Sequence, residues 1–366
     1  MIAKSAIHRV VTALAIGGAV VSVSTAAQAT SYDQTNLVTD GSVPGLTAAH
    51  TDPNLVNPWG VAFVPGNPFW VADNGTGLAT LYDRTGAIIP LVPTIPLPPS
   101  STEDHAAPTG QVANTSKKFK MTVKGKTASA IFIFSSENGT ISGWNPTVDP
   151  NAVLVVDRST LDRGAVYKGL AIATFETHHY LYATDFRNAR IDVFDEQFQP
   201  VDDFPFTDPD LPQHYAPFNI VKIASSLYVS YAVQDKFKED DVAGNGHGII
   251  DEYSLDGKLI RRFATGGGLN SPWGMVHAPA GFGAGPNRLL VGNFGNGWIN
   301  VFDIVTGAEV GFLKTPAGDP VAIEGLWSLF TDPTGKTGDL KTVYFTAGPN
   351  DEKAGLFGKL APHSAP

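Results

Sequence analysis

The stretch "NPWGVAFVPGNPFWVADNGTGLATLYDRTG" occupies residues 57–86, and a similar stretch, "SPWGMVHAPAGFGAGPNRLLVGNFGNGWINVFDIVTG", occupies residues 271–307. Both begin with Pro-Trp-Gly, continue into an alternating apolar run, turn at an Asn/Gly cluster, and end at an Asp that a Gly closely follows. Self-similarity over this distance is the mark of a repeat architecture, which predicts further copies along the chain.

Six copies can be aligned, and each contains short runs rich in Val, Ile, Phe and Tyr between Gly, Pro, Asn and Asp. Such runs are typical of antiparallel strands and turns, and the 38 Gly and 27 Pro argue against long helices. The pattern predicts an all-β protein: a six-bladed β-propeller with four-stranded antiparallel blades, forming one domain over residues 30–366. The units start near Trp59, Gly110, Gly169, Phe218, Trp273 and Gly325.

Ring closure needs a strand from outside the last unit, because that unit has three apolar runs before the chain ends. The piece "TNLVTD", Thr35 to Asp40, precedes the first unit and belongs to no other blade. We expect it to complete the last blade as its outer strand. The chain has no cysteine, so the closure must rest on hydrogen bonding and packing.

Glycine at the head of a first strand predicts a close approach of backbones near the axis, where a side chain would collide with the next blade. Gly60, Gly169, Gly274 and Gly325 stand at such positions.

The first 29 residues have the features of a secretory signal peptide. Lys4 and Arg9 are basic, residues 10–23 are apolar, and Ala27-Gln28-Ala29 is a small-x-small cleavage site. The apolar stretch is shorter than the ~20 residues that a spanning helix needs. We therefore expect cleavage after Ala29 and a secreted or periplasmic protein that does not span a membrane.

The charge balance excludes one class of partner. The chain has 35 acidic and 25 basic residues and no basic run, whereas nucleic-acid binding requires clustered Lys and Arg. Since cysteine is absent, any metal site would use oxygen or imidazole ligands, which suits a hard cation such as calcium.

Candidate ligand-binding residues lie in the loops that enter each first strand and in the turns that join second and third strands. These loops share one face of a propeller, which we name the upper face. Asn and Asp are also common turn formers, so each candidate has a structural alternative. The candidates are Asn57, Asp73, Glu137, Asn188, Asp235, Asn270, Asn293 and Asn350.

Glu324 is the first candidate for a metal ligand, because it places a carboxylate at the head of the last unit, in "IEGLW". With the amides of Asn57 and Asn270 it would offer calcium the oxygen ligands that this ion accepts. Residues 241–252 also match a calcium loop in part, although Ala243 stands where a ligand is expected.

The chain contains no Gly-x-Ser-x-Gly elbow, Walker loop or His-Glu-x-x-His motif, so the catalytic residues are unknown. Two hypotheses remain. The first is an exported propeller that binds a small-molecule, glycan or protein ligand at the upper face. The second is a calcium-dependent hydrolase or lyase with its metal near the channel axis.

Several stretches closely resemble a bacterial family of exported proteins that carries a numbered label and is related in pattern to NHL-type propellers. Among them are "HTDPNLVNPWGVAF", "YATDFRNARIDVFD" and "YFTAGPNDEKAGLFG". The resemblance implies a propeller fold and export, and it carries over no catalytic residue. "EGLW", residues 324–327, is also similar to the Glu-Gly-Pro-x-Trp motif of calcium-dependent lactonases, without the Pro.

Overall fold

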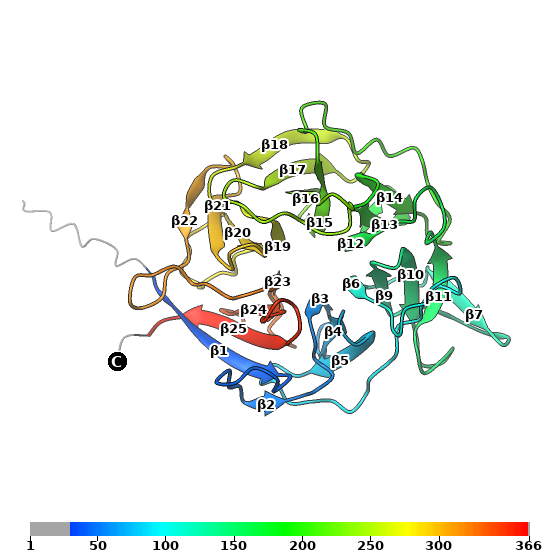
Figure 1. Ribbon diagram of the computed structural model, residues 1–366, viewed down its shortest axis with the longest axis horizontal. Helices are drawn as coiled ribbons and strands as arrows, with labels where there is room; N and C mark the ends of the chain where they lie inside the picture. Colours follow the sequence, from blue (N-terminus) through cyan, green and yellow to red (C-terminus); the bar gives the residue numbers. More distant parts are fainter. Residues whose placement is uncertain (1–29, 365–366) are drawn as a thin grey trace, which may run out of the picture.

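The computed structural model describes residues 30–364, and the expected signal peptide, residues 1–29, lies outside them. Six β-sheets stand around a central axis, each with its first strand innermost, which confirms the six-bladed propeller (Figure 1). Within residues 30–364, no helix has the length and apolar character needed to cross a bilayer.

The first three blades run from inner to outer strand. Blade 1 consists of β3 (Pro58–Ala62), β4 (Phe69–Asp73) and β5 (Leu78–Tyr82). Blade 2 consists of β6 (Pro108–Ala113), β9 (Phe132–Ser136), β10 (Thr140–Trp144) and β11 (Val153–Asp157). Blade 3 consists of β12 (Tyr167–Phe175), β13 (His178–Asp185) and β14 (Arg190–Phe194).

The remaining blades follow the same order. Blade 4 consists of β15 (Tyr215–Ile223), β16 (Ser226–Val233), β17 (Ile249–Ser254) and β18 (Leu259–Thr265). Blade 5 consists of β19 (Pro272–His277), β20 (Arg288–Asn293), β21 (Ile299–Asp303) and β22 (Glu309–Phe312). Blade 6 consists of β23 (Leu326–Phe330), β24 (Val343–Ala347) and β25 (Leu356–Pro362), followed by β1 (Tyr32–Thr39) and the short β2 (His50–Thr51).

The fourth strand of blade 6 comes from the start of the described chain, and the short β2 pairs parallel with it as a fifth. β1 pairs antiparallel with β25 from Tyr32↔Pro362 to Thr39↔Leu356, and Figure 1 shows the two strands side by side. The last blade therefore combines segments from the two ends of the domain, and hydrogen bonds join them where no disulfide is present.

Blades 1 and 3 have three strands where four were expected. In both, isolated bridges mark the position of the missing strand, as between Tyr82 and Ile88 and between Phe194 and Pro200. Both segments are rich in proline, with Pro90, Pro93 and Pro96 in blade 1 and Pro200 and Pro205 in blade 3. Proline has no N–H to donate, so a regular ladder cannot form there.

A hairpin inserted in blade 2 was not expected from the sequence. It consists of β7 (Lys120–Val123) and β8 (Lys126–Ser129), whose turn has positive φ at Lys124 and Gly125, as a tight hairpin requires. Next to it, the buried Phe119 packs at 5.3 Å from Phe198 of blade 3. The hairpin therefore covers the junction between blades 2 and 3.

Every inner strand has a register shift near its upper end. A bulge of this kind re-aims side chains. In each inner strand, one residue directly follows the last paired residue before this register shift. These six equivalent residues, which we call the ring position, are Trp59, Thr109, Lys168, Phe218, Trp273 and Trp327.

The glycine after this ring position packs against the next blade. A Cβ on Gly60 would lie 2.4 Å from the Thr109 carbonyl oxygen, and one on Gly274 would lie 2.5 Å from that of Trp327. Both distances are too short for a side chain, so the blades meet backbone to backbone at the axis. Gly325 has φ +65 and lies against Gly348 of its own blade instead.

Candidate functional site

Aromatic side chains fill the upper end of the channel. Trp59 and Trp327 stack with ring centroids 3.4 Å apart, and Phe294 stacks on the other face of Trp327 at 4.1 Å. Trp273 meets both tryptophans edge to face at 5.8 Å. We name this group the aromatic plug; its members are Trp59, Phe186, Phe218, Trp273, Phe294 and Trp327.

A hydrogen-bonded group of polar side chains lies beside the plug, and we name it the polar cluster. Its members are Asn57, Asn74, Glu137, Lys168, Asp240 and Glu352. They come from five of the six blades, and hydrogen bonds join segments as far apart as 295 residues.

Lys168 of blade 3 connects the cluster residues of blades 2 and 4. It takes the ring position that tryptophan or phenylalanine takes in four other blades, and its side chain is buried. Its Nζ donates to Glu137 and, at 3.0 Å, to Asp240, and it lies 5.2 Å from the Trp59 ring centroid. A buried ammonium is tolerated when carboxylates and aromatic faces surround it in this way.

A chain of amides continues the cluster toward blade 6. Asn74 Nδ2 donates to Glu137 Oε2 at 2.8 Å, and Asn57 Nδ2 donates to Asn74 Oδ1 at 3.2 Å and to Glu352 Oε2 at 2.7 Å. Trp327 Nε1 donates to Asn57 Oδ1 at 2.9 Å, which ties the cluster to the plug.

Two residues of the polar cluster, Asn57 and Glu352, have a left-handed backbone conformation. Asn57 has φ 46, a left-handed value that asparagine adopts more readily than most residues, and it precedes Pro58. Glu352 ends a run of three left-handed residues with Asn350 and Asp351. Three such residues in succession are costly, and strain of this kind gathers at functional sites.

The pKa values of Lys168 and Glu352 differ in their consequences for charge at the two ends of the polar cluster. Burial would lower the pKa of Lys168, but Glu137 and Asp240 outweigh that effect and raise it, so the ammonium stays charged. Burial raises the pKa of Glu352 to about 7, although the Asn57 hydrogen bond opposes the rise. The cluster therefore contains a fixed cation and a carboxyl group that exchanges its proton near neutral pH.

Two of the expected ligand-binding residues, Asn57 and Glu137, lie in the polar cluster. Others have local partners. Asn188 Nδ2 donates to Asp185 Oδ2 at 2.7 Å, and Asp235 accepts N–H groups of its own loop, so both hold turns. Asp73 is fully buried at the end of β4, where burial raises its pKa.

The other candidates lie outside the cluster. Asn293 Oδ1 accepts the N–H of Asn270, and Asn270 Oδ1 accepts the N–H of Gly244, so this pair joins blade 5 to the blade-4 insertion. Glu324 is exposed and accepts the N–H of Asn350 at 2.9 Å. No hydrogen bond joins Glu324 to Asn57 or Asn270 in the described part of the chain.

A metal ion is held by several ligand side chains that lie close enough together to coordinate it. No group of three or more His, Asp or Glu side chains in residues 30–364 is placed to hold a metal ion. In the region that resembled a calcium loop, Glu252 belongs to strand β17 and pairs with Arg261 at 2.8 Å. Its last four residues, Ile249 to Glu252, therefore belong to a strand, and the carboxylate at the twelfth position is paired with Arg261.

Lys168, Asp240 and Glu352 were not found by sequence reasoning. For Lys168 a signal was present, because "YKG" aligns with "PWG" and puts a lysine in a tryptophan's place. Asp240 and Glu352 lie within long loops, where no spacing indicates which side chain reaches the axis.

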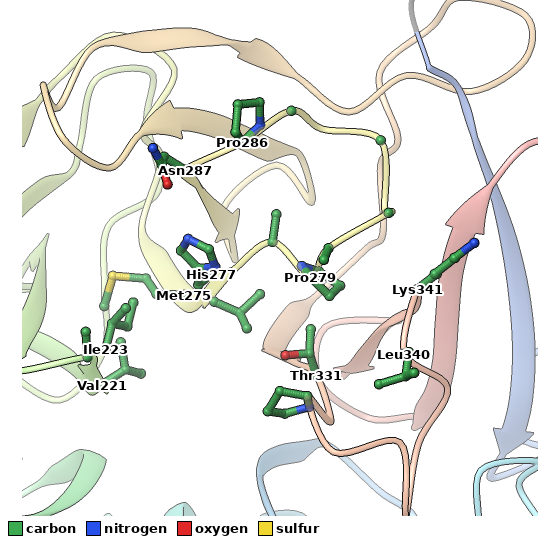
Figure 2. A pocket seen from close by; sticks show the side chains of 18 of the residues that line it. Val221, Ile223, Met275, His277, Pro279, Pro286, Asn287, Thr331, Leu340 and Lys341 are labelled. Carbon is green, nitrogen blue, oxygen red and sulfur yellow. The ribbon is translucent and has the colours of Figure 1, made fainter.

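Two hollows lie on the opposite, lower face. An axial cavity of about 230 Å³ lies below the plug and is lined by Trp273, Gly60 and Gln111 among others. A groove of about 1100 Å³ lies beside it, between the lower ends of blades 4, 5 and 6 (Figure 2). The polar cluster and these two hollows are thus on different faces. We assign the candidate site by the side-chain chemistry of the upper face.

Solved propeller structures have a similar fold. The PQQ-bound aldose sugar dehydrogenase from Streptomyces coelicolor has a TM-score of 0.51 at 14% identity, and the alignment covers 91% of this chain and 98% of that one. A glucose dehydrogenase has a TM-score of 0.51 at 12% identity, with 86% and 98% coverage. At these identities the similarity shows the propeller fold alone.

Relatives by sequence are much more similar. No family model matches the chain. Uncharacterized protein R648 of Acanthamoeba polyphaga mimivirus is 38% identical over 319 residues, 86% of this chain and 76% of its own. Uncharacterized protein L690 of the same virus is 37% identical over 321 residues, with 86% and 82% coverage. These relatives are viral, whereas the resemblance in the sequence pointed to bacterial proteins. The chain belongs to the same family as R648 and L690.

Proposed function

We propose that the protein is an exported, NHL-like propeller that binds a small-molecule, glycan or protein ligand at the upper mouth of its channel. The observation that carries the proposal is the polar cluster, in which side chains from five blades meet beside the aromatic plug. Residues that only stabilise a local turn form hydrogen bonds within that turn, whereas the residues of the polar cluster form hydrogen bonds between blades.

The charges of the cluster favour a particular kind of ligand. Glu137, Asp240 and Glu352 are hydrogen-bond acceptors, and Lys168 compensates for only one of their charges when all are ionised. The Asp240 side chain is 74% exposed and that of Glu137 is 24% exposed, whereas that of Lys168 is 2% exposed. A ligand would meet the carboxylates first, so we expect one that presents amine or hydroxyl donors.

Titration calorimetry with amines, amino sugars and neutral oligosaccharides tests the proposal. Asp240→Asn keeps the size of an exposed side chain and removes a charge. We expect it to weaken binding about tenfold, equivalent to ~1.4 kcal/mol. Glu103→Gln, an exposed position outside the cluster, is the matched control. Equal affinities of the two variants, or no binding by any member of the panel, would count against the upper mouth as the site.

Acid–base catalysis at the same mouth is a second candidate, and Glu352 favours it. A carboxyl group whose pKa is about 7 suits a general acid or base at neutral pH. A screen of lactone and ester hydrolysis and of lyase substrates would detect it. We expect any turnover to depend on a group that titrates near pH 7 and to be lost in Glu352→Gln.

Calcium dependence stays a prediction. The amide oxygens of Asn57 and Asn270 already accept N–H groups from Trp327 and Gly244, and Glu324 faces Asn350, so the three do not form one set of ligands as they stand. Metal analysis of the purified protein, compared with Glu324→Gln, tests it: calcium bound in stoichiometric amount and lost in the variant would support a site there.

A further inference from the structure

The groove on the lower face is a second hollow that the polar cluster does not use. Val221 and Ile223 of β15 form one side, and Thr331 and Leu340 of the β23–β24 loop form the other, as Figure 2 shows. Leu340 is 55% exposed. The groove therefore offers apolar walls to solvent.

The third wall is the loop of residues 278–287 between β19 and β20. Phe282 holds this loop, because it is fully buried and stacks on Tyr32 of β1 with centroids 4.6 Å apart. Gly281 and Gly283 have φ of +81 and +91, which lets the loop turn around that contact. Phe282 thus fastens the loop to the core behind it, and Ala278, Pro279, Ala280 and Pro286 line the groove.

Ionisable groups in the groove are all basic. Lys222, His277 and Lys341 line it, and none of its lining residues within the described chain is Asp or Glu. Lys222 is exposed and its Nζ donates to the Ala224 carbonyl at 2.8 Å, while Figure 2 shows Lys341 at the rim with its ammonium directed outward. Because the chain as a whole carries a formal charge of −10, this basic and apolar lining departs from the rest of the surface.

The groove continues toward the axis. The groove and the axial cavity share the lining residues Val221, Met275, Val276 and Thr331, and Trp273 of the plug also lines the cavity. An elongated apolar body could therefore extend from the groove into the channel, with a charged head left near Lys222.

We propose that the lower groove binds an amphipathic carboxylate: an alkyl chain that lies on the apolar walls and enters the axial cavity, with a carboxylate near Lys222 and His277. Burial of the alkyl chain supplies the affinity, and the basic groups select the anionic head over a neutral or cationic one. This site is separate from the upper mouth and does not depend on its function.

Titration of the protein with dodecanoate, below its micelle concentration, tests the proposal. Dodecanol and dodecylammonium carry the same chain with a neutral and a cationic head. We expect dodecanoate to bind one to one and at least tenfold more tightly than either. Lys222→Glu should remove most of this preference, and Val276→Trp should block entry to the axial cavity and weaken all three compounds.

Lys126→Glu is the matched control, since Lys126 is exposed on β8 and outside the groove. Thermal unfolding shows whether each variant is folded, and light scattering shows whether a second copy covers the groove. Equal binding of the three head groups, unchanged binding in Lys222→Glu, or a dimer that dodecanoate does not dissociate would each overturn the proposal. Dodecanoate that binds Lys222→Glu as weakly as dodecanol does would support it.

Discussion

Replacing Glu352 with glutamine should stabilise the protein, and the gain should depend on pH. The ordinary pKa of a glutamate is 4.5, and in the native protein burial raises that of Glu352 to about 7. Between these values the native carboxyl keeps a proton that the unfolded chain has lost. The free energy of unfolding therefore falls as pH rises from about 4.5 to about 7, and the loss is complete above that.

The magnitude follows from the two pKa values. At about 1.4 kcal/mol for each pH unit, the interval corresponds to ~3 kcal/mol of stability lost at pH 8. The value of about 7 already includes the favourable effects of Asn57 and Lys168 on the ionised form. The glutamine of the variant carries no charge at any pH, and its carbonyl can accept the Asn57 N–H. We expect Glu352→Gln to match the wild type near pH 4.5 and to exceed it by ~3 kcal/mol at pH 8.

Urea unfolding at a series of pH values, followed by tryptophan fluorescence, measures this difference. Other buried carboxyl groups such as Asp73 change both proteins alike, so the difference isolates residue 352. Glu103→Gln, at an exposed position, should show no such trend. A constant difference between pH 5 and pH 8, or a variant less stable than the wild type at pH 8, would refute the assignment of a buried, weakly acidic carboxyl.

Three further substitutions test the core of the ring. Gln111→Leu should raise the free energy of unfolding by about 1–3 kcal/mol in urea unfolding, because neither amide atom of the buried Gln111 has a hydrogen-bond partner among residues 30–364; a lower free energy of unfolding would show that the amide does have a partner. Lys168→Met should cost ~2–4 kcal/mol by the same assay, since Glu137 loses its counter-ion, and unchanged stability would contradict the ion pair. Gly60→Ala should lower the melting temperature, because its Cβ would lie 2.4 Å from the Thr109 carbonyl oxygen, and a neutral result would show that the blades can separate.

Much of the fold could be predicted from local pattern. The recurring apolar runs between turn residues located six blades, because the strands of each blade need the same alternation, and Pro-Trp-Gly marks the head of two of them. The three-stranded sheets of blades 1 and 3 were missed, although the prolines that interrupt their ladders were visible.

The candidate site was predicted less well, because its residues share no local signal. Asn57 and Asn270 occupy similar loops, yet the first lies in the polar cluster and the second holds the blade-4 insertion through Gly244. Glu324 is exposed and accepts the N–H of Asn350, while Glu352 from the next loop reaches Asn57.

Local sequence was thus enough to establish the repeats, the strands and the face on which the polar loops gather, since these depend on neighbours a few residues apart. Which side chains meet depends instead on the closed ring. Asn57 and Glu352 are separated by 295 residues and come together at 2.7 Å because the ring closes through the pairing of β1 with β25. Hydrogen bonds and ion pairs require side chains to lie within a few ångströms of each other, and the separation of two residues in the sequence does not give their distance in space.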